Sequence, residues 1–252
     1  MTPEERAHRK NVFFELFDGL PRQGPGDVES TKRAFAMLTT LPSRPRILDI
    51  GCGPGAQTLE LAQLSDGDIT ATDIHESFLD ELSERARHAG LADRITVRLE
   101  SMLDFPIAEP PFDLIWAEGS IYVIGFERGL REWRRLLKDD GYIAVTHLSW
   151  LTSNVPAEAE QFWVEEKIVN VEENLRITAE SGYRVVGHFA LPTSAWWNEY
   201  YSPLEERLPG ARMKYIGDTI AQSLIDNIQK EINLYRDYSK YYGYEFYVMQ
   251  KA

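Results

Sequence analysis

The stretch ILDIGCGPGAQT, from Ile47 to Thr58, decides the fold. Its apolar beginning predicts a buried strand, and its end begins an amphipathic helical pattern. Between the two, Gly51, Gly53 and Gly55 leave alternate positions without a Cβ, which indicates that another group approaches this backbone closely. The stretch therefore predicts a strand, a ligand-binding loop and a helix in succession.

Composition narrows the class of protein. The chain has 252 residues, of which 43% are hydrophobic and 27% charged, so it can bury a substantial core. Its formal net charge of -13 would repel a polyphosphate backbone, so no nucleic-acid partner is expected. A single cysteine, Cys52, excludes an internal disulfide and gives no sign of an oxidising compartment. With no signal-peptide pattern and no apolar run of about 18 residues, a cytoplasmic protein without a membrane partner is predicted.

Short apolar runs alternate with amphipathic stretches from residue 46 onward. This alternation predicts an α/β fold with a parallel sheet and helices on both faces. The predicted strands cover 46–50, 68–73, 95–100, 112–117 and 142–147, and the predicted helices cover 56–64, 76–89 and 126–138.

The last hundred residues have a different pattern. One long helix is expected over 157–181 and a strand over 183–190, and YEFYVMQ predicts a final strand from residue 244. About fifty residues between those strands are rich in aromatics and include a helix with Ile216, Ile220, Leu224 and Ile228 at four-residue spacing. An insertion of this length is typical of a lid or cap. The predicted domains are an N-terminal helical segment with a lid loop (1–45), a cofactor-binding core (46–192), an aromatic-rich helical cap (193–243) and a last core strand (244–252).

Two cofactor classes use a glycine loop after the first strand. Residues 51–56 satisfy the G-x-G-x-x-A pattern of dinucleotide-binding proteins, and Asp73 lies at the spacing of a ribose ligand. From Asp49 the same residues contain D-x-G-x-G-x-G, which resembles the first motif of class I S-adenosylmethionine-dependent methyltransferases. The Asp49 carboxylate would repel a dinucleotide pyrophosphate, which favours the methyltransferase resemblance. An NAD(P)-dependent oxidoreductase and a non-catalytic cofactor-binding protein remain the alternatives.

The resemblance extends along most of the chain. FDLIWAEGSIY, a helix and LLKDDGYIAVTH are similar to the fourth strand, fourth helix and fifth strand of that family. RQGPG at 22–26, EGSIYVIGFERGLREW and YYGYEFY resemble a group of bacterial small-molecule methyltransferases of unassigned substrate. The resemblance implies a Rossmann-like seven-stranded methyltransferase sheet with a C-terminal helical cap. It also implies S-adenosyl-L-methionine as cofactor and S-adenosyl-L-homocysteine as product, but it names no acceptor.

The resemblance also implies a set of cofactor-binding residues. Asp73 would bind both ribose hydroxyls, with a helix cap completed by Glu76 as the alternative. Ser101 and Met102 would line the adenine or pack as an ordinary loop, and Glu118 would contact the methionine ammonium or the acceptor, or cap the next helix. The loop at 23–24 would close over the methionine or form a surface turn. The full implied set is Asp49, Gly51, Cys52, Gly53, Gly55, Asp73, Ile74, Ser101, Met102, Glu118, Gln23 and Gly24.

Candidate catalytic residues are few. His147 ends the fifth predicted strand and could take a proton from an acceptor hydroxyl or thiol, although a structural histidine is the alternative. Tyr122 and Glu118 are the other candidates. Methyl transfer from a sulfonium is an in-line displacement that requires alignment and exclusion of water, so it can proceed without a dedicated catalytic residue.

Aromatic residues mark the predicted acceptor pocket. Trp196, Trp197, Tyr200 and Tyr201 form one helical stripe, which is either core packing or a wall that faces the acceptor. Such rings could favour a cationic amine. The predicted substrate-binding residues are Tyr122, Trp150, Trp196, Trp197 and Tyr200. The five histidines and one cysteine have no close metal-ligand spacing, so no metal is expected.

Overall fold

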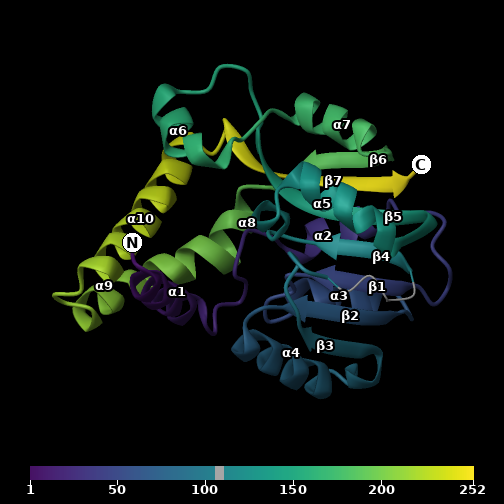
Figure 1. The fold of residues 1–252 in the computed structure, drawn as a ribbon, viewed down its shortest axis with the longest axis horizontal. Helices are drawn as coiled ribbons and strands as arrows, with labels where there is room; N and C mark the ends of the chain where they lie inside the picture. Colours follow the sequence, from purple (N-terminus) through teal and green to yellow (C-terminus); the bar gives the residue numbers. More distant parts are fainter. Residues whose placement is uncertain (106–110) are drawn as a thin grey trace.

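The computed structural model describes residues 1–105 and 111–252, and within them the strands form one seven-stranded sheet (Figure 1). The strand order is β3-β2-β1-β4-β5-β7-β6, with β7 antiparallel to both of its neighbours and the other pairs parallel. This confirms the Rossmann-like seven-stranded α/β fold. The strands are β1 (Arg46–Ile50), β2 (Asp68–Asp73), β3 (Ile95–Leu99), β4 (Phe112–Ala117), β5 (Leu137–Trp150), β6 (Tyr183–Ala190) and β7 (Tyr242–Lys251).

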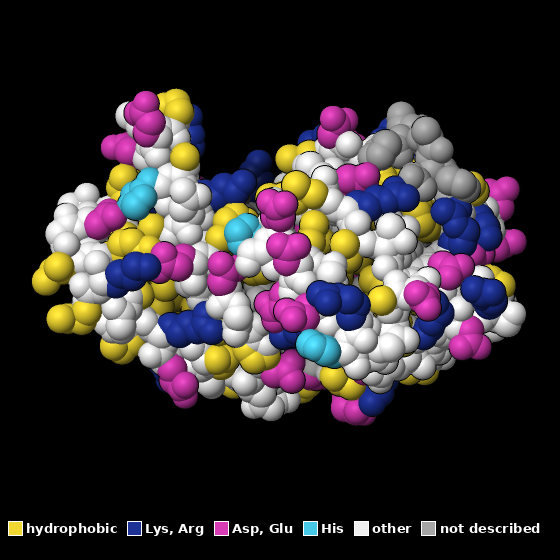
Figure 2. Space-filling view, turned by 90° about the horizontal axis from the view of Figure 1, so that it is seen from below, with side chains coloured by type: hydrophobic (Ala, Val, Ile, Leu, Met, Phe, Trp, Pro, Cys, Tyr) yellow, Lys and Arg dark blue, Asp and Glu magenta, His cyan; other side chains and the backbone are white. Residues whose placement is uncertain are grey.

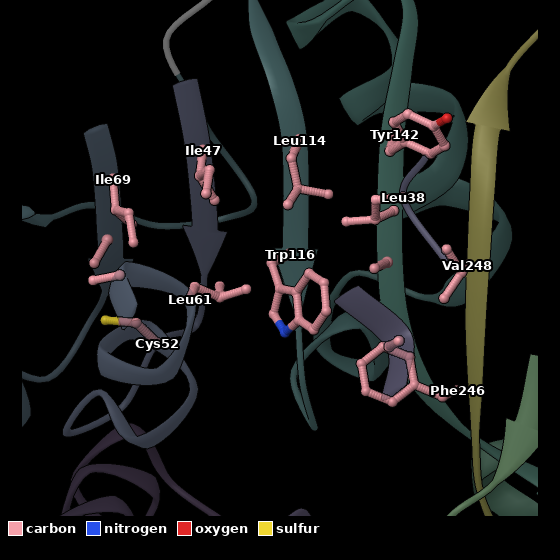
Figure 3. Close-up of a cluster of buried hydrophobic side chains, with 14 of the residues drawn as sticks. Leu38, Ile47, Cys52, Leu61, Ile69, Leu114, Trp116, Tyr142, Phe246 and Val248 are labelled. Atoms are coloured by element: carbon pink, nitrogen blue, oxygen red, sulfur yellow. The ribbon is translucent and has the colours of Figure 1, made fainter. Parts of the chain in front are cut away.

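Helices cover both faces of the sheet because successive strand residues point to opposite sides. Ile47 packs toward α2, α3 and α4, whereas Leu48 packs toward α5 and α7. Figure 3 shows the first of these clusters, in which Leu61 of α3 and Trp116 of β4 lie among the strand side chains. The core helices are α2 (Val28–Phe35), α3 (Ala56–Leu64), α4 (Glu76–His88), α5 (Phe126–Trp133) and α7 (Val171–Glu180).

A third apolar cluster joins the two ends of the chain beside the sheet. Val12 and Leu16 of the first helix pack with Leu224 and Ile225 of the last one, and the helices stand together on the left of Figure 1. The first helix and the C-terminal insertion therefore form one helical lobe, whereas α2 of the N-terminal segment packs on the sheet. The elements of the lobe are α1 (Pro3–Phe17), α8 (Ser194–Trp196), a π-helix (Trp197–Tyr201), α9 (Ser202–Lys214) and α10 (Thr219–Tyr238).

The structure differs from several sequence predictions, and one difference is that β5 covers 137–150 instead of the predicted 142–147. The single helix over 157–181 is wrong: α6 (Ala157–Phe162) ends early, a 3-10 turn (Val164–Glu166) follows, and Lys167 adopts a left-handed conformation with φ 49 before Asn170 caps α7. Ile216 is 79% exposed and precedes α10, which Asp218 caps. The helix predicted over 126–138 is shorter in the structure: α5 ends at Trp133, a 3-10 turn covers Arg134–Leu136, and β5 begins at residue 137.

Candidate active site

The glycine loop lies at the carboxyl end of β1, where the backbone N–H groups of Gly51 and Cys52 both donate to the carbonyl of Thr72. Gly55 has φ +85, and a Cβ there would stand 2.1 Å from a methyl carbon of Leu82. This position needs glycine because helix α4 packs directly on the loop. At Gly53 (φ +53) an added Cβ would instead meet the side-chain oxygen of a cavity-lining glutamine at 3.2 Å. At Gly51 (φ +71) an added Cβ would stand 2.5 Å from the Cβ of Ser120, so each of the three glycines has its own steric reason.

Asp49 is fully buried beneath the loop. It accepts hydrogen bonds from the Thr58 hydroxyl at 2.6 Å and from the Gln57 amide at 3.3 Å, so it ties the end of β1 to the first turns of α3. Burial raises the pKa of Asp49 to about 7, and the carboxylates of Glu118 and Asp73 raise it further, against the two hydrogen bonds. Asp49 therefore holds the loop and adds negative charge below it.

Asp73 lies at the end of β2 and reaches across to the same loop. One carboxylate oxygen accepts from the Gly53 N–H at 3.0 Å, and the other accepts from the N–H groups of Ile74 and His75. Burial raises the pKa of Asp73, while these backbone donors lower it. Helix α4 has His75 as its N-cap without a side-chain bond, so the capping box of Asp73 and Glu76 is not formed.

A cavity of about 260 Å³ opens above the loop. Ten of the twelve predicted cofactor residues line it, whereas Asp49 and Gly55 lie below it. Sequence reasoning missed Arg22, Glu100 and three rings from α1 and α4; for Arg22 the quoted RQGPG motif was the available signal. The ten predicted residues are Gln23, Gly24, Gly51, Cys52, Gly53, Asp73, Ile74, Ser101, Met102 and Glu118, and the three rings are Phe13, Phe14 and Phe78.

A buried ion pair closes one side of this cavity. The Glu118 carboxylate accepts from the Arg22 guanidinium at 3.1 Å, from the Thr31 hydroxyl at 2.7 Å and from the Trp116 indole at 2.9 Å. Arg22 also donates to Glu199 of the π-helix at 3.0 Å, which joins the N-terminal loop, the core and the insertion. The Nη2 of Arg22 is buried and has no hydrogen-bond partner among the described residues.

A second cavity, of about 590 Å³, adjoins the first. Tyr122 and the loop at 23–25 line both cavities, so the two cavities are adjacent and share these residues as a common wall. Of the predicted substrate-binding residues, Tyr122, Trp196 and Tyr200 line the larger cavity. Trp150 packs instead edge-on against a core tyrosine, and Trp197 lies under the Arg236 guanidinium. Tyr201, named in the aromatic stripe but not among the predicted substrate-binding residues, lines it too, and the rings that the prediction missed are Phe13, Phe17, Phe126, Trp163 and Tyr244.

His147 lines the larger cavity near the end of β5. Its ring stacks on Phe126, with 4.8 Å between the ring centroids, and its Nδ1 is buried without a partner among the described residues. Burial lowers the pKa of His147 to about 4, so the imidazole is neutral near pH 7. It can accept a proton there but is a weak base. Burial also raises the pKa of the Cys52 thiol well above its usual range, which keeps it protonated.

Residues 1–105 and 111–252 contain neither a group of metal ligands nor a helix able to cross a membrane. In that part of the chain, no three or more His, Cys, Asp or Glu side chains are grouped so that they could hold a metal ion. No helix there combines the length and the apolar character needed to cross a membrane.

The fold and the site together define a class of protein. A sheet with β7 inserted antiparallel between β5 and β6, a glycine loop after β1 and an acidic residue at the end of β2 is the arrangement of Rossmann-like methyltransferases. A family model described as a methyltransferase domain matches residues 47–141. Residues 47–141 therefore form a methyltransferase domain, and the fold, the site and the comparisons support an enzyme that depends on S-adenosyl-L-methionine as cofactor.

Individual relatives agree with this class. The 27-O-demethylrifamycin SV methyltransferase of Amycolatopsis mediterranei is 26% identical over 231 residues, which are 84% of each chain. A methyltransferase from Geobacter sulfurreducens, solved with S-adenosyl-L-homocysteine, superposes with a TM-score of 0.81 at 18% identity and covers 96% of this chain and 98% of its own. One from Thiobacillus denitrificans, solved with the same ligand, gives a TM-score of 0.79 at 18% identity, with 96% and 97% covered.

The smaller cavity fits this cofactor by charge. Asp73, Glu118 and Glu100 line it and Asp49 lies below it, so its field favours a ligand with positive charges such as a sulfonium and an ammonium. The unpartnered Nη2 of Arg22 offers the one complementary group needed by a carboxylate. A dinucleotide pyrophosphate would bring two negative charges toward the same carboxylates, which disfavours the NAD(P) alternative.

Proposed function

We propose that this methyltransferase acts on a small-molecule acceptor held in the larger cavity, next to the cofactor in the smaller one. The observation that carries the proposal is that the two cavities are adjacent and share Gln23, Gly24, Gly119 and Tyr122 in their lining. A volume of about 590 Å³ is within the usual range for small-molecule sites. The relative from Amycolatopsis mediterranei, named for a rifamycin substrate, supports an acceptor of this general kind.

We assign the cofactor contacts by position. Asp73 would bind the ribose hydroxyls, and Ser101 with Met102 would flank the adenine, since all three line the smaller cavity beyond β2 and β3. Arg22 would bind the methionine carboxylate, because its Nη2 has no other described partner. Gln23 would close over the methionine between the two cavities.

The chain's own residues carry out alignment and protection. When bound, the cofactor supplies an activated methyl group on a sulfonium. The shared wall of Gln23, Gly24 and Tyr122 would orient the acceptor toward it, and the rings of the larger cavity would exclude water. His147 can accept a proton from an acceptor whose own pKa is low.

The helical lobe would select the acceptor. Residues 193–243 supply Trp196, Tyr200, Tyr201 and Glu231 to the larger cavity but none of the lining of the smaller one. This supports the division into a cofactor-binding core at 46–192 and a cap at 193–243.

A cytoplasmic location and the lack of a nucleic-acid partner stay predictions from composition. On the face shown in Figure 2, basic side chains are interspersed with acidic ones.

The test is cofactor binding by the purified chain. We expect S-adenosyl-L-homocysteine to raise the melting temperature, since a ligand at a hundred times its Kd adds about 2.7 kcal/mol of apparent stability. NADH and NADPH should give no shift. A shift with either dinucleotide and none with S-adenosyl-L-homocysteine would overturn the proposal.

A matched pair of variants locates the site. Gly53→Leu adds a side chain to the wall of the smaller cavity and should weaken S-adenosyl-L-homocysteine binding by about tenfold or more. Gly90→Leu introduces the same left-handed strain, at φ +69, with no atom near the added Cβ. Its affinity should match the wild type, and equal losses in both variants would count against this placement.

A further inference from the structure

Two carboxylates beside the cavities, the buried Glu118 and the part-buried Glu231, are satisfied very differently. Glu118 accepts from a guanidinium, a hydroxyl and an indole N–H. Glu231, on α10, accepts only from the Tyr201 hydroxyl, at 2.8 Å, among the described residues. A carboxylate with one neutral donor is poorly compensated for its loss of water. Glu231 also lines the larger cavity, so the missing partner can reach it from there.

The surroundings of Glu231 add negative charge and aromatic surface. Burial raises the pKa of Glu231 to about 7, the nearby Glu166 raises it further, and the Tyr201 hydroxyl lowers it. Lys167, Arg128, Glu127 and neutral His147 also line this cavity, but the charge that shifts Glu231 is that of Glu166. The walls beside it are the rings of Trp163, Trp196, Tyr200, Tyr201 and Tyr244.

We propose that Glu231 binds a positively charged nitrogen on the acceptor, so that the substrates of this enzyme are amine-bearing molecules with an apolar body. A cation would pair electrostatically with the carboxylate and would lie against ring faces that attract it. The proposal rests on the proposed function, because it takes the larger cavity to be the acceptor site. It concerns recognition: the methylated atom lies at the junction near Tyr122, and Glu231 fixes the other part of the molecule.

The rest of the cavity fits this chemistry better than an anionic acceptor. A carboxylate or phosphate on the acceptor would face Glu231 and Glu166 together. An uncharged apolar acceptor would leave the Glu231 carboxylate with its single donor, so it would gain nothing from that residue. Only a cation turns the poorly compensated acid into a favourable contact.

The experiment compares two probes of one shape on the full chain saturated with S-adenosyl-L-homocysteine. The first probe is benzyldimethyl(hydroxyethyl)ammonium, and the second is its carbon isostere, in which a quaternary carbon replaces the nitrogen. Calorimetry at pH 8 should show binding of the ammonium about tenfold tighter than that of the isostere. Glu231→Gln keeps the size of the side chain, and it should remove this preference.

Asp237→Asn is the matched control, because Asp237 is an exposed acid on the same helix and the change alters net charge equally. It should keep the wild-type preference. Equal affinities for the two probes, a tighter isostere, no probe binding, or a preference that survives in Glu231→Gln would each overturn the inference while the proposed function stands. Failure of S-adenosyl-L-homocysteine to bind the wild type would instead overturn the proposed function, and the inference with it.

Discussion

The two cavities are adjacent but are built in different ways. The smaller one is formed mainly by short segments that follow β1, β2, β3 and β4, so the sheet itself fixes their positions. The larger one collects side chains from α1, the end of β5, the turn at 164–169, the π-helix and α10, which are held together by packing in the helical lobe. Strand ends thus provide a common cofactor site, and packed helices provide a specific acceptor site.

The difference teaches where substitutions should act. A change in the smaller cavity alters a loop that a rigid sheet supports, so it should reduce binding more than folding. The rings of the larger cavity also belong to a core cluster, so changes there should affect both folding and recognition.

The largest expected effect is at Trp196, which is 2% exposed and stacks on Tyr235 with 4.2 Å between ring centroids. Trp196→Ala should lower the free energy of unfolding by about 3–5 kcal/mol. Trp197→Ala, at the partly exposed neighbour under Arg236, should lower it by about 1 kcal/mol. Urea titrations of the two variants measure this difference in the free energy of unfolding. Equal losses would contradict the placement of Trp196 in the core of the lobe and of Trp197 at its surface.

The second effect is at the buried pair of Arg22 and Glu118, both under 5% exposed at the side chain. Arg22→Met leaves the Glu118 carboxylate without its cation, so it should lower stability by about 3–5 kcal/mol. Adding Glu118→Gln should recover part of that loss, because the uncompensated charge is removed. A double-mutant cycle by chemical denaturation gives the coupling free energy between the two side chains. If the stability losses of the two single variants simply add in the double variant, the two residues do not interact as a buried ion pair.

The third effect is on binding. Asp73→Ala should weaken S-adenosyl-L-homocysteine affinity by about 1.5–3 kcal/mol, the range for hydrogen bonds to a charged group. Because Asp73 also accepts from Gly53, Ile74 and His75, the variant should lose some stability as well. Calorimetry and melting should be measured together. Lower stability with unchanged affinity would assign Asp73 to the loop alone.

The smallest effect depends on pH. The folded pKa of Glu231, about 7, is above its ordinary value of 4.5, so ionisation opposes folding. Its penalty is absent below about pH 4.5, grows between that value and pH 7, and is complete above pH 7. Glu231→Gln should therefore be more stable than the wild type by about 1–3 kcal/mol at pH 8, and this advantage should largely disappear at pH 5. Denaturation at the two pH values checks the sign.

The sequence predicted the cofactor region well because its signals are local. Arg46–Ile50, Asp68–Asp73 and Phe112–Ala117 have the predicted bounds, since each is an apolar run bounded by turn residues. The carboxyl ends of parallel strands meet at one edge, so residues after three strands could be placed together without knowing the packing. Asp49 shows the limit: its position in the motif was correct, but only the structure places its carboxylate below the cavity, where it accepts from the start of α3.

The residues that line the acceptor cavity could not be predicted from local sequence patterns in the same way. Helical spacing grouped Trp196, Trp197 and Tyr200, but only Trp196 and Tyr200 line the larger cavity, whereas Trp197, within the π-helix at 197–201, lies under Arg236. Glu231 had no motif around it, and its role depends on Tyr201, thirty positions away in the chain. Arg22 likewise acquires its role from Glu118 and Glu199, which lie on two other segments.

The sequence by itself determined the class of protein, its cofactor and the residues of the glycine loop. Local patterns suffice for these because strand, turn and helix follow one another within some thirty residues of Arg46. Only the tertiary structure decided which side chains face the acceptor and how each buried charge is compensated. Those properties depend on contacts between segments about two hundred residues apart, such as the packing of α1 on α10. The hydrophobic periodicity of a helix indicates which of its faces is buried, but it does not specify which element packs against that face.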